Sequence, residues 1–267
     1  MAILNVTPDS FADGGALYRD SQLDLGLVAA KVEKMIADGA EIIDIGGEST
    51  RPGSRSISAS EEFERVIPAL EVIAKHFDIA ISVDTSNPQI IAAAASAGAH
   101  LINDVRALSR PGAVVAAAKS GLPICLMHMQ GQPDTMQHSP RYDDVVEEVK
   151  TYLQSRIDTC LQAGIDEANL WVDPGFGFGK TLDHNMTLLR NLSALTTLNC
   201  PLVVGISRKS MIEKLLGRGL PDRLPGSLAL NLIALQRGAS VLRVHDVAAT
   251  RDIINVFMAC EDYRSAN

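Results

Sequence analysis

The sequence has few aromatic residues, no long apolar run and no basic leader. Phe, Trp and Tyr together make up 4% of its 267 residues, which leaves few rings on which nucleic-acid bases could stack. No apolar run reaches the roughly 18 residues expected of a membrane-spanning helix. The opening residues, MAILNVTPDSF, lack the basic and apolar segments of a signal peptide. These absences predict a cytoplasmic protein with no membrane partner.

Cysteine is scarce and is not spaced in pairs. The four cysteines are Cys125, Cys160, Cys200 and Cys260, and no CxxC motif occurs among them. A disulfide framework or a structural zinc site would need a different spacing. We therefore expect reduced thiols, which are usual in the cytoplasm.

Positive charge is also in short supply. Lys and Arg total 24 against 32 Asp and Glu, which gives a formal net charge of −8 at pH 7. Nonspecific nucleic-acid binding depends on phosphate neutralisation by Lys and Arg, and the sequence has no basic stripe for it. A small molecule is the expected partner, and an anionic one would need a few specifically placed cations.

Eight short apolar runs rich in Ile, Val and Leu recur along the chain. Runs that are apolar on both faces suit parallel strands covered by helices. Their starts are about 34 residues apart on average, close to the roughly 30 residues or more of a strand plus a crossover helix. The runs are residues 2–6, 41–45, 79–83, 100–102, 123–127, 169–172, 201–206 and 240–244.

Helical segments fill the intervals between these runs. Residues 21–38 carry apolar side chains at helical spacing, and Asn87 followed by Pro88 is a typical helix start. The alternation predicts a parallel sheet. Eight units without a long insert favour one (β/α)8 TIM barrel over residues 1–267 rather than an open doubly wound sheet. Glycines that can end a helix precede five of the runs, at Gly39, Gly98, Gly121, Gly164 and Gly238.

Each predicted strand delivers a polar or ionisable side chain at its carboxyl end. The active site of a (β/α)8 barrel lies on that rim. Helix capping could explain any one of these residues, but it is a poor explanation for all eight strands and for the His and Lys residues among them. The rim residues are Asn5, Thr7, Glu48, Asp84, Asn103, Asp104, His128, Asp173, Ser207, Lys209 and His245.

The segment DPGFGFGKT at residues 173–181 is similar to a nucleotide-binding loop but fails both common patterns. A Walker loop needs glycine where Pro174 stands, and the three alternating glycines do not fit GxGxxG. We interpret the segment as a flexible loop after the sixth strand, with the Asp173 carboxylate at its start.

Three segments near the rim could bind an anion. GGESTRPG at residues 46–53 offers Ser, Thr and Arg beside glycines that permit close approach of the backbone. SRKS at residues 207–210 opens a helix over residues 211–216, whose free N–H groups favour an anion. Arg243 and His245 share one face of the last strand.

Asp84, Asn103 and Asp173 come from three strands and combine hydrogen-bond acceptors with a donor. Such a trio could hold a flat heterocycle that carries N–H and amino groups. Carboxylates could also bind a metal, but the sequence has no HExxH motif and no tight Asp/His cluster.

Taken together, eight segments resemble the dihydropteroate synthase family, in that family's order and over nearly the whole chain. Any one of them would be weak, whereas all eight are specific. The segments are ILNVTPDSFADGG, GGESTRPG, SVDTS, INDV, LMHMQG, DPGFGFGK, SRKS and RVHDV. The resemblance implies a (β/α)8 barrel that joins 6-hydroxymethyl-7,8-dihydropterin diphosphate to 4-aminobenzoate, giving 7,8-dihydropteroate and pyrophosphate.

The resemblance also implies roles for individual residues. The pterin contacts would be Asp84, Asn103, Asp173 and Lys209. The diphosphate side would be formed by Asn5, Thr50, Arg51, Arg243 and His245, with Asn5 as the protein ligand of Mg²⁺. The aminobenzoate pocket would be formed by Phe11, Pro52, Phe178 and Ser210, and the first loop would be ordered by Asp13. The catalytic residues would be Asp84, Asp173, Lys209, Arg243 and His245.

The chemistry implied is a dissociative displacement at a methylene carbon next to an electron-rich ring. Asp84 and Asp173 would stabilise positive charge on the pterin, while Mg²⁺ and the cations would stabilise the leaving diphosphate. An arylamine is already nucleophilic, so no strong general base is required. The family further implies a homodimer formed through the outer helices and an enzyme targeted by sulfonamides.

Three other functions would share parts of this pattern. A methyltransferase that passes a methyl group from a folate to a corrinoid protein would need the pterin residues but not the anion site. An aldolase could form a Schiff base on Lys209. A non-catalytic pterin carrier would bind the ring without releasing pyrophosphate. The sequence departs from the family at one point, because Met1-Ala2 begins at the strand itself, where a short segment usually precedes it; this concerns the bottom of the barrel.

Overall fold

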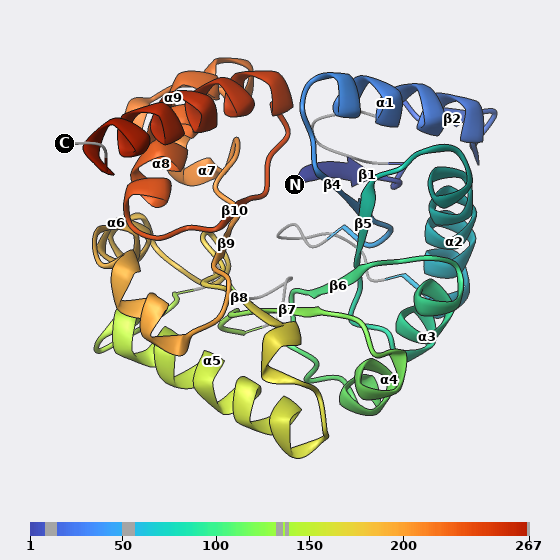
Figure 1. Ribbon diagram of the computed structural model, residues 1–267, viewed down its shortest axis with the longest axis horizontal. Helices are drawn as coiled ribbons and strands as arrows, with labels where there is room; N and C mark the ends of the chain where they lie inside the picture. Colours follow the sequence, from blue (N-terminus) through green and yellow to red (C-terminus); the bar gives the residue numbers. More distant parts are fainter. Residues whose placement is uncertain (9–14, 50–56, 132–135, 137–138, 266–267) are drawn as a thin grey trace.

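The computed structural model describes residues 1–8, 15–49, 57–131, 136 and 139–265, with side chains described up to residue 261. The strands form a ring around one axis, and the helices lie outside it (Figure 1). The chain follows the ring in sequence order, so that α9 returns to the neighbourhood of α1.

Within the described residues, eight parallel strands form the ring, one for each predicted run. Six pair in chain order from β1 to β8, and β9 pairs with β10. Parallel bridges from Val172 to Leu202 and from Ala2 to Val244 join the two sets, so the ring is closed. The strands are β1 (Ala2–Asn5), β4 (Ile42–Gly46), β5 (Ala80–Asp84), β6 (Leu101–Asp104), β7 (Ile124–Met127), β8 (Leu170–Asp173), β9 (Val203–Val204) and β10 (Val241–Leu242).

This arrangement confirms the (β/α)8 barrel predicted from the sequence. The last two strands are shorter than their apolar runs, because only two residue pairs of β9 and β10 are in register. Hydrogen bonds from Ile3 N to Val244 O and from Val244 N to Met1 O, both 3.0 Å long, complete the closure.

The helices cover the outside of the ring. The predicted start at Asn87 is confirmed, because its side chain accepts a hydrogen bond from Gln89 N at 3.0 Å and Pro88 begins the helix. All five glycines predicted to end helices have φ between 68° and 98°. The α-helices are α1 (Leu25–Ala37), α2 (Ala59–His76), α3 (Pro88–Ser96), α4 (Ala113–Ser120), α5 (Val145–Gln162), α6 (Leu182–Arg190), α7 (Ser210–Leu216), α8 (Leu224–Gln236) and α9 (Val247–Ser265). Short 3₁₀ turns are η1 (Glu167–Asn169), η2 (Leu192–Leu198) and η3 (Leu220–Asp222).

The helix predicted over residues 21–38 begins later than expected. Residues before it form a small hairpin of β2 (Tyr18–Arg19) and β3 (Gln22–Leu23). Its turn places Asp20 and Ser21 in the left-handed region, at φ 48° and 65°. Asp24 then caps α1 by accepting hydrogen bonds from two backbone N–H groups.

The barrel has an outer and an inner core. Ala2, Leu4 and Val6 alternate along the first strand and pack between the ring and the helices. A smaller cluster fills the inside of the ring towards the amino ends of the strands, and consists of Leu101, Cys125 and Val203 against Met1, Trp171 and Val241. The inside of the ring is therefore apolar towards the amino ends of the strands, which leaves the carboxyl ends for polar side chains.

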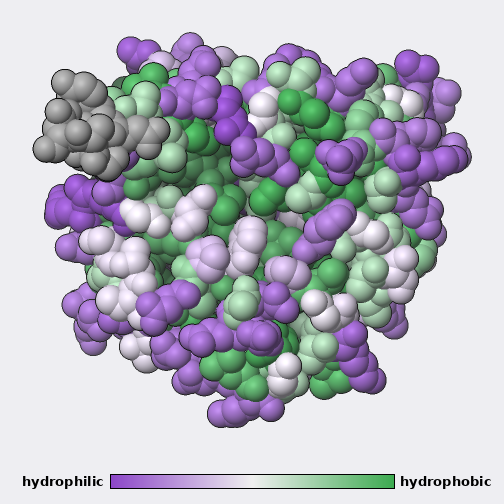
Figure 2. All heavy atoms as spheres, viewed as in Figure 1, coloured by the Kyte–Doolittle hydropathy of each residue, from purple (hydrophilic) through white to green (hydrophobic). Residues whose placement is uncertain are grey.

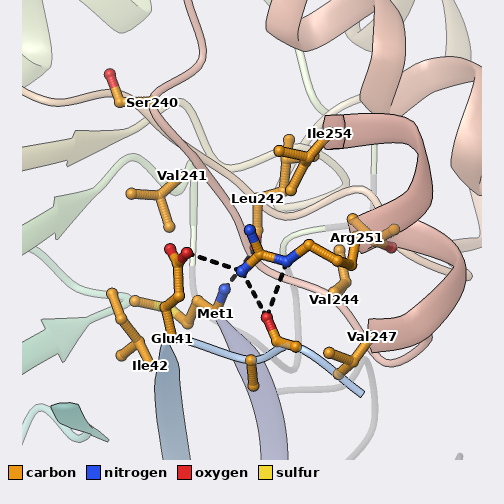
Figure 3. Close-up of a pocket in the computed structure, with 13 residues that line it drawn as sticks. Met1, Glu41, Ile42, Ser240, Val241, Leu242, Val244, Val247, Arg251 and Ile254 are labelled. Atoms are coloured by element: carbon orange, nitrogen blue, oxygen red, sulfur yellow. Dashed lines mark hydrogen bonds and ion pairs between the residues drawn. The ribbon is translucent and has the colours of Figure 1, made fainter. Parts of the chain in front are cut away.

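The face at the amino ends of the strands is held together by Arg251 of α9 (Figure 3). The Nη2 atom of Arg251 lies 2.8 Å from Glu41 Oε1, and its Nε and Nη2 atoms donate to Gly39 O. A cavity of about 90 Å³ lies beside these contacts, and the Met1 amino group donates to Leu242 O at 3.0 Å. The Arg251 contacts bind the last helix to the segment before β4, and the Met1 contact joins β1 to β10, a structural task expected of this face.

Hydrophilic residues gather on the outer helices, whereas apolar and near-neutral residues are more frequent towards the centre of the ring (Figure 2). Among the described residues, no helix combines the length and apolar character that a bilayer crossing requires.

Candidate active site

The polar end of the ring is built from one inward-facing residue at or near the carboxyl end of each strand. The two-residue period of a strand and the pairing register place these residues on the inner side. They are Asn5, Gly46, Asp84, Asn103, Met127, Asp173, Gly205 and Arg243. A Cβ on Gly205 would lie 3.9 Å from Asp173 Oδ2, and one on Gly46 would lie 3.6 Å from Asn5 Oδ1. The two glycines thus keep the middle of this layer open between charged side chains.

Arg243 joins two carboxylates at the centre of this layer. Its Nε donates to Asp44 Oδ2 at 2.6 Å, and its Nη2 donates to Asp84 Oδ2 at 2.9 Å. Asp44 also accepts hydrogen bonds from Ser82 Oγ at 2.6 Å and Asn103 Nδ2 at 3.3 Å. One fully buried carboxylate therefore fixes two of the predicted site residues, Asn103 and Arg243.

Asp44 was not among the site residues predicted from the sequence. The available signal was one acidic residue within the otherwise apolar strand IIDIG, because a buried carboxylate needs partners. Its partners come from β5, β6 and the end of β10, which the local sequence around Asp44 does not reveal.

The charges in this cluster do not balance. Burial raises the pKa of Asp84 to about 8, with Arg243 opposing that rise and Asp44 adding to it. Burial alone would lower the pKa of Arg243, but Asp44 and Asp84 raise it above its usual range. Arg243 is therefore a permanent cation shared between two acids, and Asp84 is the acid that can gain a proton near neutral pH.

Asp173 and Lys209 form the opposite side of the layer. Asp173 Oδ1 accepts a hydrogen bond from Gly175 N at 2.7 Å, while Lys209 Nζ donates to Phe176 O at 2.5 Å and lies 4.6 Å from the centre of the Phe178 ring. Burial raises the pKa of Asp173, although Lys209 opposes this rise. Burial lowers the pKa of Lys209 to about 8, although the charge of Asp173 acts against it. Lys209 therefore loses its proton more readily than an exposed lysine does.

The loop after β8 is held in place by a buried cation. Lys180 Nζ lies 2.9 Å from His128 Nδ1 and donates to Gly175 O at 3.0 Å and Phe178 O at 3.2 Å. Burial lowers the pKa of Lys180 to about 7 and that of His128 to about 2. The predicted rim residue His128 therefore serves this loop, and Lys180 is a second residue that the sequence analysis did not single out.

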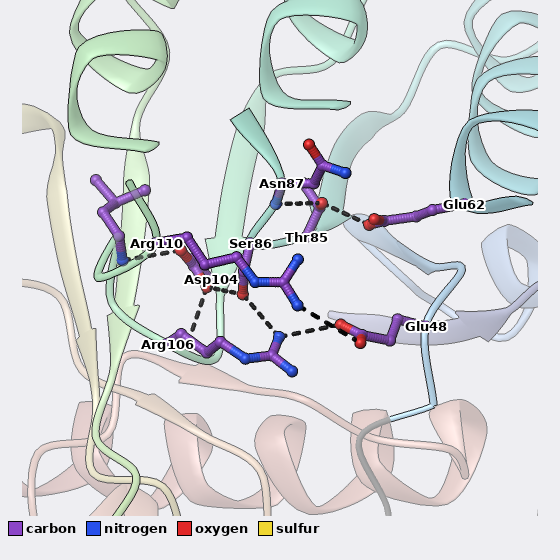
Figure 4. A network of polar contacts seen from close by, with 9 residues as sticks. Glu48, Glu62, Thr85, Ser86, Asn87, Asp104, Arg106 and Arg110 are labelled. Atoms are coloured by element: carbon purple, nitrogen blue, oxygen red, sulfur yellow. Dashed lines mark hydrogen bonds and ion pairs between the residues drawn. The ribbon is translucent and has the colours of Figure 1, made fainter. Parts of the chain in front are cut away.

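Two further predicted rim residues, Glu48 and Asp104, belong to a separate polar network (Figure 4). Arg106 Nη1 lies 3.0 Å from Glu48 Oε2 and donates to Ser86 Oγ at 3.1 Å. Asp104 accepts hydrogen bonds from Ser86 Oγ and from the backbone N–H groups of Arg106 and Leu108. This network ties the loops after β4, β5 and β6 to one another, beside the central layer.

His245 lies at the end of the last strand, against the turn after β9. Its backbone N donates to Ser207 Oγ at 3.2 Å, and its Nδ1 lies 3.1 Å from the same oxygen. A cavity of about 380 Å³ lies beside it, next to α1 and the start of α9. The structure thus brings Asp84, Asn103, Asp173, Lys209 and Arg243 together at the central layer. Ser207 precedes Lys209 by two residues, and His245 contacts Ser207 from the next strand.

Several predicted site residues lie outside the described residues. They are Phe11, Asp13, Thr50, Arg51 and Pro52. Of the remaining predictions for the aminobenzoate pocket, Phe178 lies against Lys209, and Ser210 begins α7.

A metal ion at this rim would need oxygen atoms from Asn5 and from a bound phosphate. In the part of the chain that the structure describes, no group of three or more His, Cys, Asp or Glu side chains could hold a metal. The Asn5 amide oxygen is nevertheless an oxygen donor on the polar rim, next to Asp84 across Gly46. Mg²⁺ commonly takes one or two protein oxygens together with substrate phosphates and waters, so this donor set fits a metal that arrives with a phosphate ligand.

Comparison with known proteins agrees with this geometry. A family described as pterin binding enzymes matches residues 1–245. The dihydropteroate synthase of Escherichia coli (strain K12) is 54% identical over 259 residues, covering 97% of this chain and 90% of the relative. The Yersinia pestis dihydropteroate synthase in a sulfonamide drug complex has a TM-score of 0.93 and 50% identity, covering 100% of this chain and 93% of that chain. The Xanthomonas albilineans dihydropteroate synthase in complex with 7,8-dihydropteroate has a TM-score of 0.85 and 43% identity, covering 97% of this chain and 92% of that chain.

Proposed function

Because this chain belongs to the dihydropteroate synthase family of pterin-binding enzymes, which are transferases, we propose that it joins 6-hydroxymethyl-7,8-dihydropterin diphosphate to 4-aminobenzoate. The products are 7,8-dihydropteroate and pyrophosphate. The observation that carries the proposal is the layer of acids and cations around Arg243, at the rim where this fold keeps its chemistry.

The pterin ring would bind within this layer. Asp84 and Asp173 offer carboxylate oxygens to its N–H and amino groups, and Asn103 offers an amide whose orientation Asp44 fixes. Lys209 completes the set as a donor to the ring. Gly46 and Gly205 leave the space that a flat ring needs between these side chains.

The diphosphate would lie towards the cations of the rim. Arg243 and His245 supply the donors that the structure describes, and Thr50 and Arg51 are assigned to the same side by the family pattern. Asn5 would hold Mg²⁺ together with the diphosphate oxygens. The bound ion would offset negative charge on the leaving group.

The aminobenzoate would approach from the side of α7. Its carboxylate would be received by Ser210, while its ring would pack among Phe178, Phe11 and Pro52. Asp13 would help to order the first loop over this pocket. The sulfonamide complex of the Yersinia relative leads us to propose that sulfonamides compete for the same pocket.

The reaction would be a dissociative displacement. The bond between the pterin methylene carbon and the diphosphate oxygen breaks, the ring carries the positive charge, and the arylamine nitrogen then forms the new C–N bond and loses a proton. Asp84 and Asp173 would stabilise the cationic ring, and Arg243 would stabilise the departing anion. Arg243 is already held by Asp44 and Asp84 before the substrate arrives, so this cation needs little reorganisation during the step.

The cell-level proposals follow the same family pattern. We propose that the enzyme works in the cytoplasm and that it forms a homodimer through its outer helices. Its partners are the two small substrates, and neither nucleic acid nor membrane is involved.

The experiment that tests the function measures pyrophosphate release from the pterin diphosphate with Mg²⁺, with and without 4-aminobenzoate. Release that depends on the amine and yields 7,8-dihydropteroate is expected. Amine-independent release would indicate a hydrolase. Tight pterin binding without release would favour the corrinoid methyltransferase or a pterin carrier.

A further inference from the structure

Arg208 adopts a backbone conformation that is unusual for its residue type. Its φ is 56°, in the left-handed region that residues other than Gly, Asn and Asp seldom enter. It lies between Ser207 and Lys209, at the turn from β9 into α7. A residue of this kind keeps such a conformation only where its surroundings hold it, and such positions cluster at functional sites.

Two buried side chains at the start of α8 hold the backbone of Arg208. The Arg208 N–H donates to Ser227 Oγ at 2.9 Å, and the Arg208 carbonyl accepts a hydrogen bond from Arg223 Nη1 at 2.9 Å. Arg223 immediately precedes α8 and Ser227 lies in its first turn, four residues apart, so both face the same turn. Arg223 is 5% exposed and Ser227 is 2% exposed, so water does not compete strongly for these bonds.

The same turn is also held by Glu213 of α7 and by Asp246, the residue before α9. Arg223 forms an ion pair with Glu213 of α7, which fixes the other end of its guanidinium group. The side chain of Arg208 reaches Asp246, with its Nε 2.8 Å from Asp246 Oδ2. Because Arg208 points to Asp246, its charge is turned away from the start of α7, where it would oppose the helix dipole.

The residues on either side of Arg208 belong to the rim. Lys209 reaches across to Phe176 O and lies beside Asp173, and Ser207 Oγ accepts the His245 N–H. The dihedral angles at position 208 set the direction in which the chain leaves Ser207 and enters Lys209. A change of Arg208 to the ordinary helical region would redirect the Lys209 side chain away from Asp173.

We propose that Ser227 and Arg223 are positioning residues, which hold Arg208 in the left-handed conformation and thereby direct Lys209 towards Asp173. The proposal rests on the proposed function, since the part that Lys209 plays in turnover is assigned there. Neither α8 residue touches the central layer, so their effect on the reaction passes through the backbone of one turn.

The first test replaces the hydroxyl group by Ser227→Ala. We expect kcat/KM for the pterin diphosphate to fall about tenfold, because small displacements of a positioned group are costly to turnover. The matched control is Ser120→Ala at the opposite face of the barrel. Ser120 Oγ likewise accepts a backbone N–H, from Leu122 at 3.2 Å, and donates to a helix carbonyl, that of Ala117 at 2.6 Å. The control should lose similar stability and keep the wild-type kcat/KM.

A second pair of variants tests the same proposal if Ser227→Ala does not fold. Arg223→Lys keeps the charge but loses the fork that reaches both Arg208 and Glu213. Arg237→Lys is its control, because Arg237 lies at the other end of α8 and donates to the carbonyls of Leu189 and Arg190. Only Arg223→Lys should lower kcat/KM.

A third measurement separates conformation from packing. In an Arg208→Gly background the left-handed conformation carries no steric penalty, so the further loss on adding Ser227→Ala should be about threefold or less. A crystal structure of Ser227→Ala should show Arg208 with negative φ and Lys209 Nζ no longer bonded to Phe176 O.

The outcomes separate this proposal from the proposed function. Equal kcat/KM in Ser227→Ala and Ser120→Ala, or an unchanged Arg208 in the crystal structure, would overturn the positioning role. A wild-type protein that makes no dihydropteroate would overturn the function instead, and the crystal structure of the variant would still decide the conformational part.

Discussion

Arg243 pairs with two carboxylates, Asp44 and Asp84, so one buried negative charge has no matching cation. This surplus charge lowers the stability of the folded state. Burial raises the pKa of Asp84 to about 8, from an ordinary value of 3.8, with Asp44 adding to the rise. A carboxyl group whose pKa is higher in the folded state binds its proton more tightly when folded. The stability that this group contributes is therefore present below about pH 4 and is lost as the pH rises through about 8.

Replacing Asp84 should thus stabilise the protein while impairing it. We expect Asp84→Asn to raise the free energy of unfolding at pH 8 by roughly 1–2 kcal/mol, a size typical of relieving strain at a functional site. Because the wild-type penalty grows with pH, the gain at pH 5 should be smaller. Urea denaturation at the two pH values measures both quantities, and a gain that is equal at both would contradict the account. Turnover should be largely lost.

Asp173 should matter more to the reaction than to folding. We expect Asp173→Asn to lower kcat by about 10² to 10³, the size of effect seen when one preorganised electrostatic contact is removed. The asparagine keeps an oxygen for the Gly175 N–H, so stability should change little.

A matched control for this variant is Asp166→Asn. Asp166 Oδ1 accepts the N–H of Ala168 at 3.0 Å, which is the same kind of short turn, but it lies before β8 at the other end of the strand. Comparison of kcat with the urea midpoint for each variant tests the distinction. Normal kinetics for Asp173→Asn would count against the dissociative mechanism.

The loop after β8 is shaped by contact with the end of β7. Gly175 has a φ of 68°, and a Cβ there would lie 1.8 Å from His128 O. Gly121 has the same φ of 68°, but a Cβ there would meet nothing within 4 Å. The two glycines therefore share a conformation and differ in their surroundings.

Alanine at these two positions should separate backbone strain from collision. Gly121→Ala should cost about 1–2 kcal/mol, the penalty of the left-handed conformation alone. Gly175→Ala should cost roughly 3 kcal/mol or more, since the loop must also move off β7. Urea denaturation compares the two variants, and equal losses would show that the loop yields freely.

The sequence predicts the elements of this fold better than their edges. The eight strands are evident because both faces of each are buried, which leaves continuous apolar runs. The start of α1 was wrong because Asp24 caps it and residues 18–23 fold into a hairpin. The cap is a side-chain contact with the backbone and the hairpin is a pairing of backbone groups, and the spacing of apolar residues indicates neither.

The rim was predicted as a group, but the structure divides it. Asp84, Asn103 and Asp173 face the inside of the ring, whereas Asp104 and His128 serve the polar network and the loop after β8. Side chains alternate between the inside and the outside of the ring along a strand. The side of a residue at the strand end can therefore be assigned only when the last paired residue of that strand is known. Asp44 and Lys180 were missed because their importance lies in partners that are distant in the sequence.

The thiols report on the folded state of the whole molecule. Three of the four cysteines are buried in the structure, and only Cys260 is exposed. Burial also raises the pKa of Cys160 to about 11, which lowers its reactivity further. One thiol per chain should react with a disulfide reagent at pH 8 in the native protein, and all four should react in urea. Rapid reaction of a second thiol without urea would indicate an opening of the barrel.

Closure of the ring has a consequence for the order of events during synthesis. Met1 and Leu242, which are joined by a hydrogen bond, are separated by 241 positions in the chain. Closing so long a loop costs conformational entropy, and this cost is incurred before β1 can pair with the last strand. Until β10 has left the ribosome, β1 offers an open edge to any passing strand. A strand that is made before all the others of the ring is therefore among the last to be protected, and chaperone demand should be greatest while β10 is still being made.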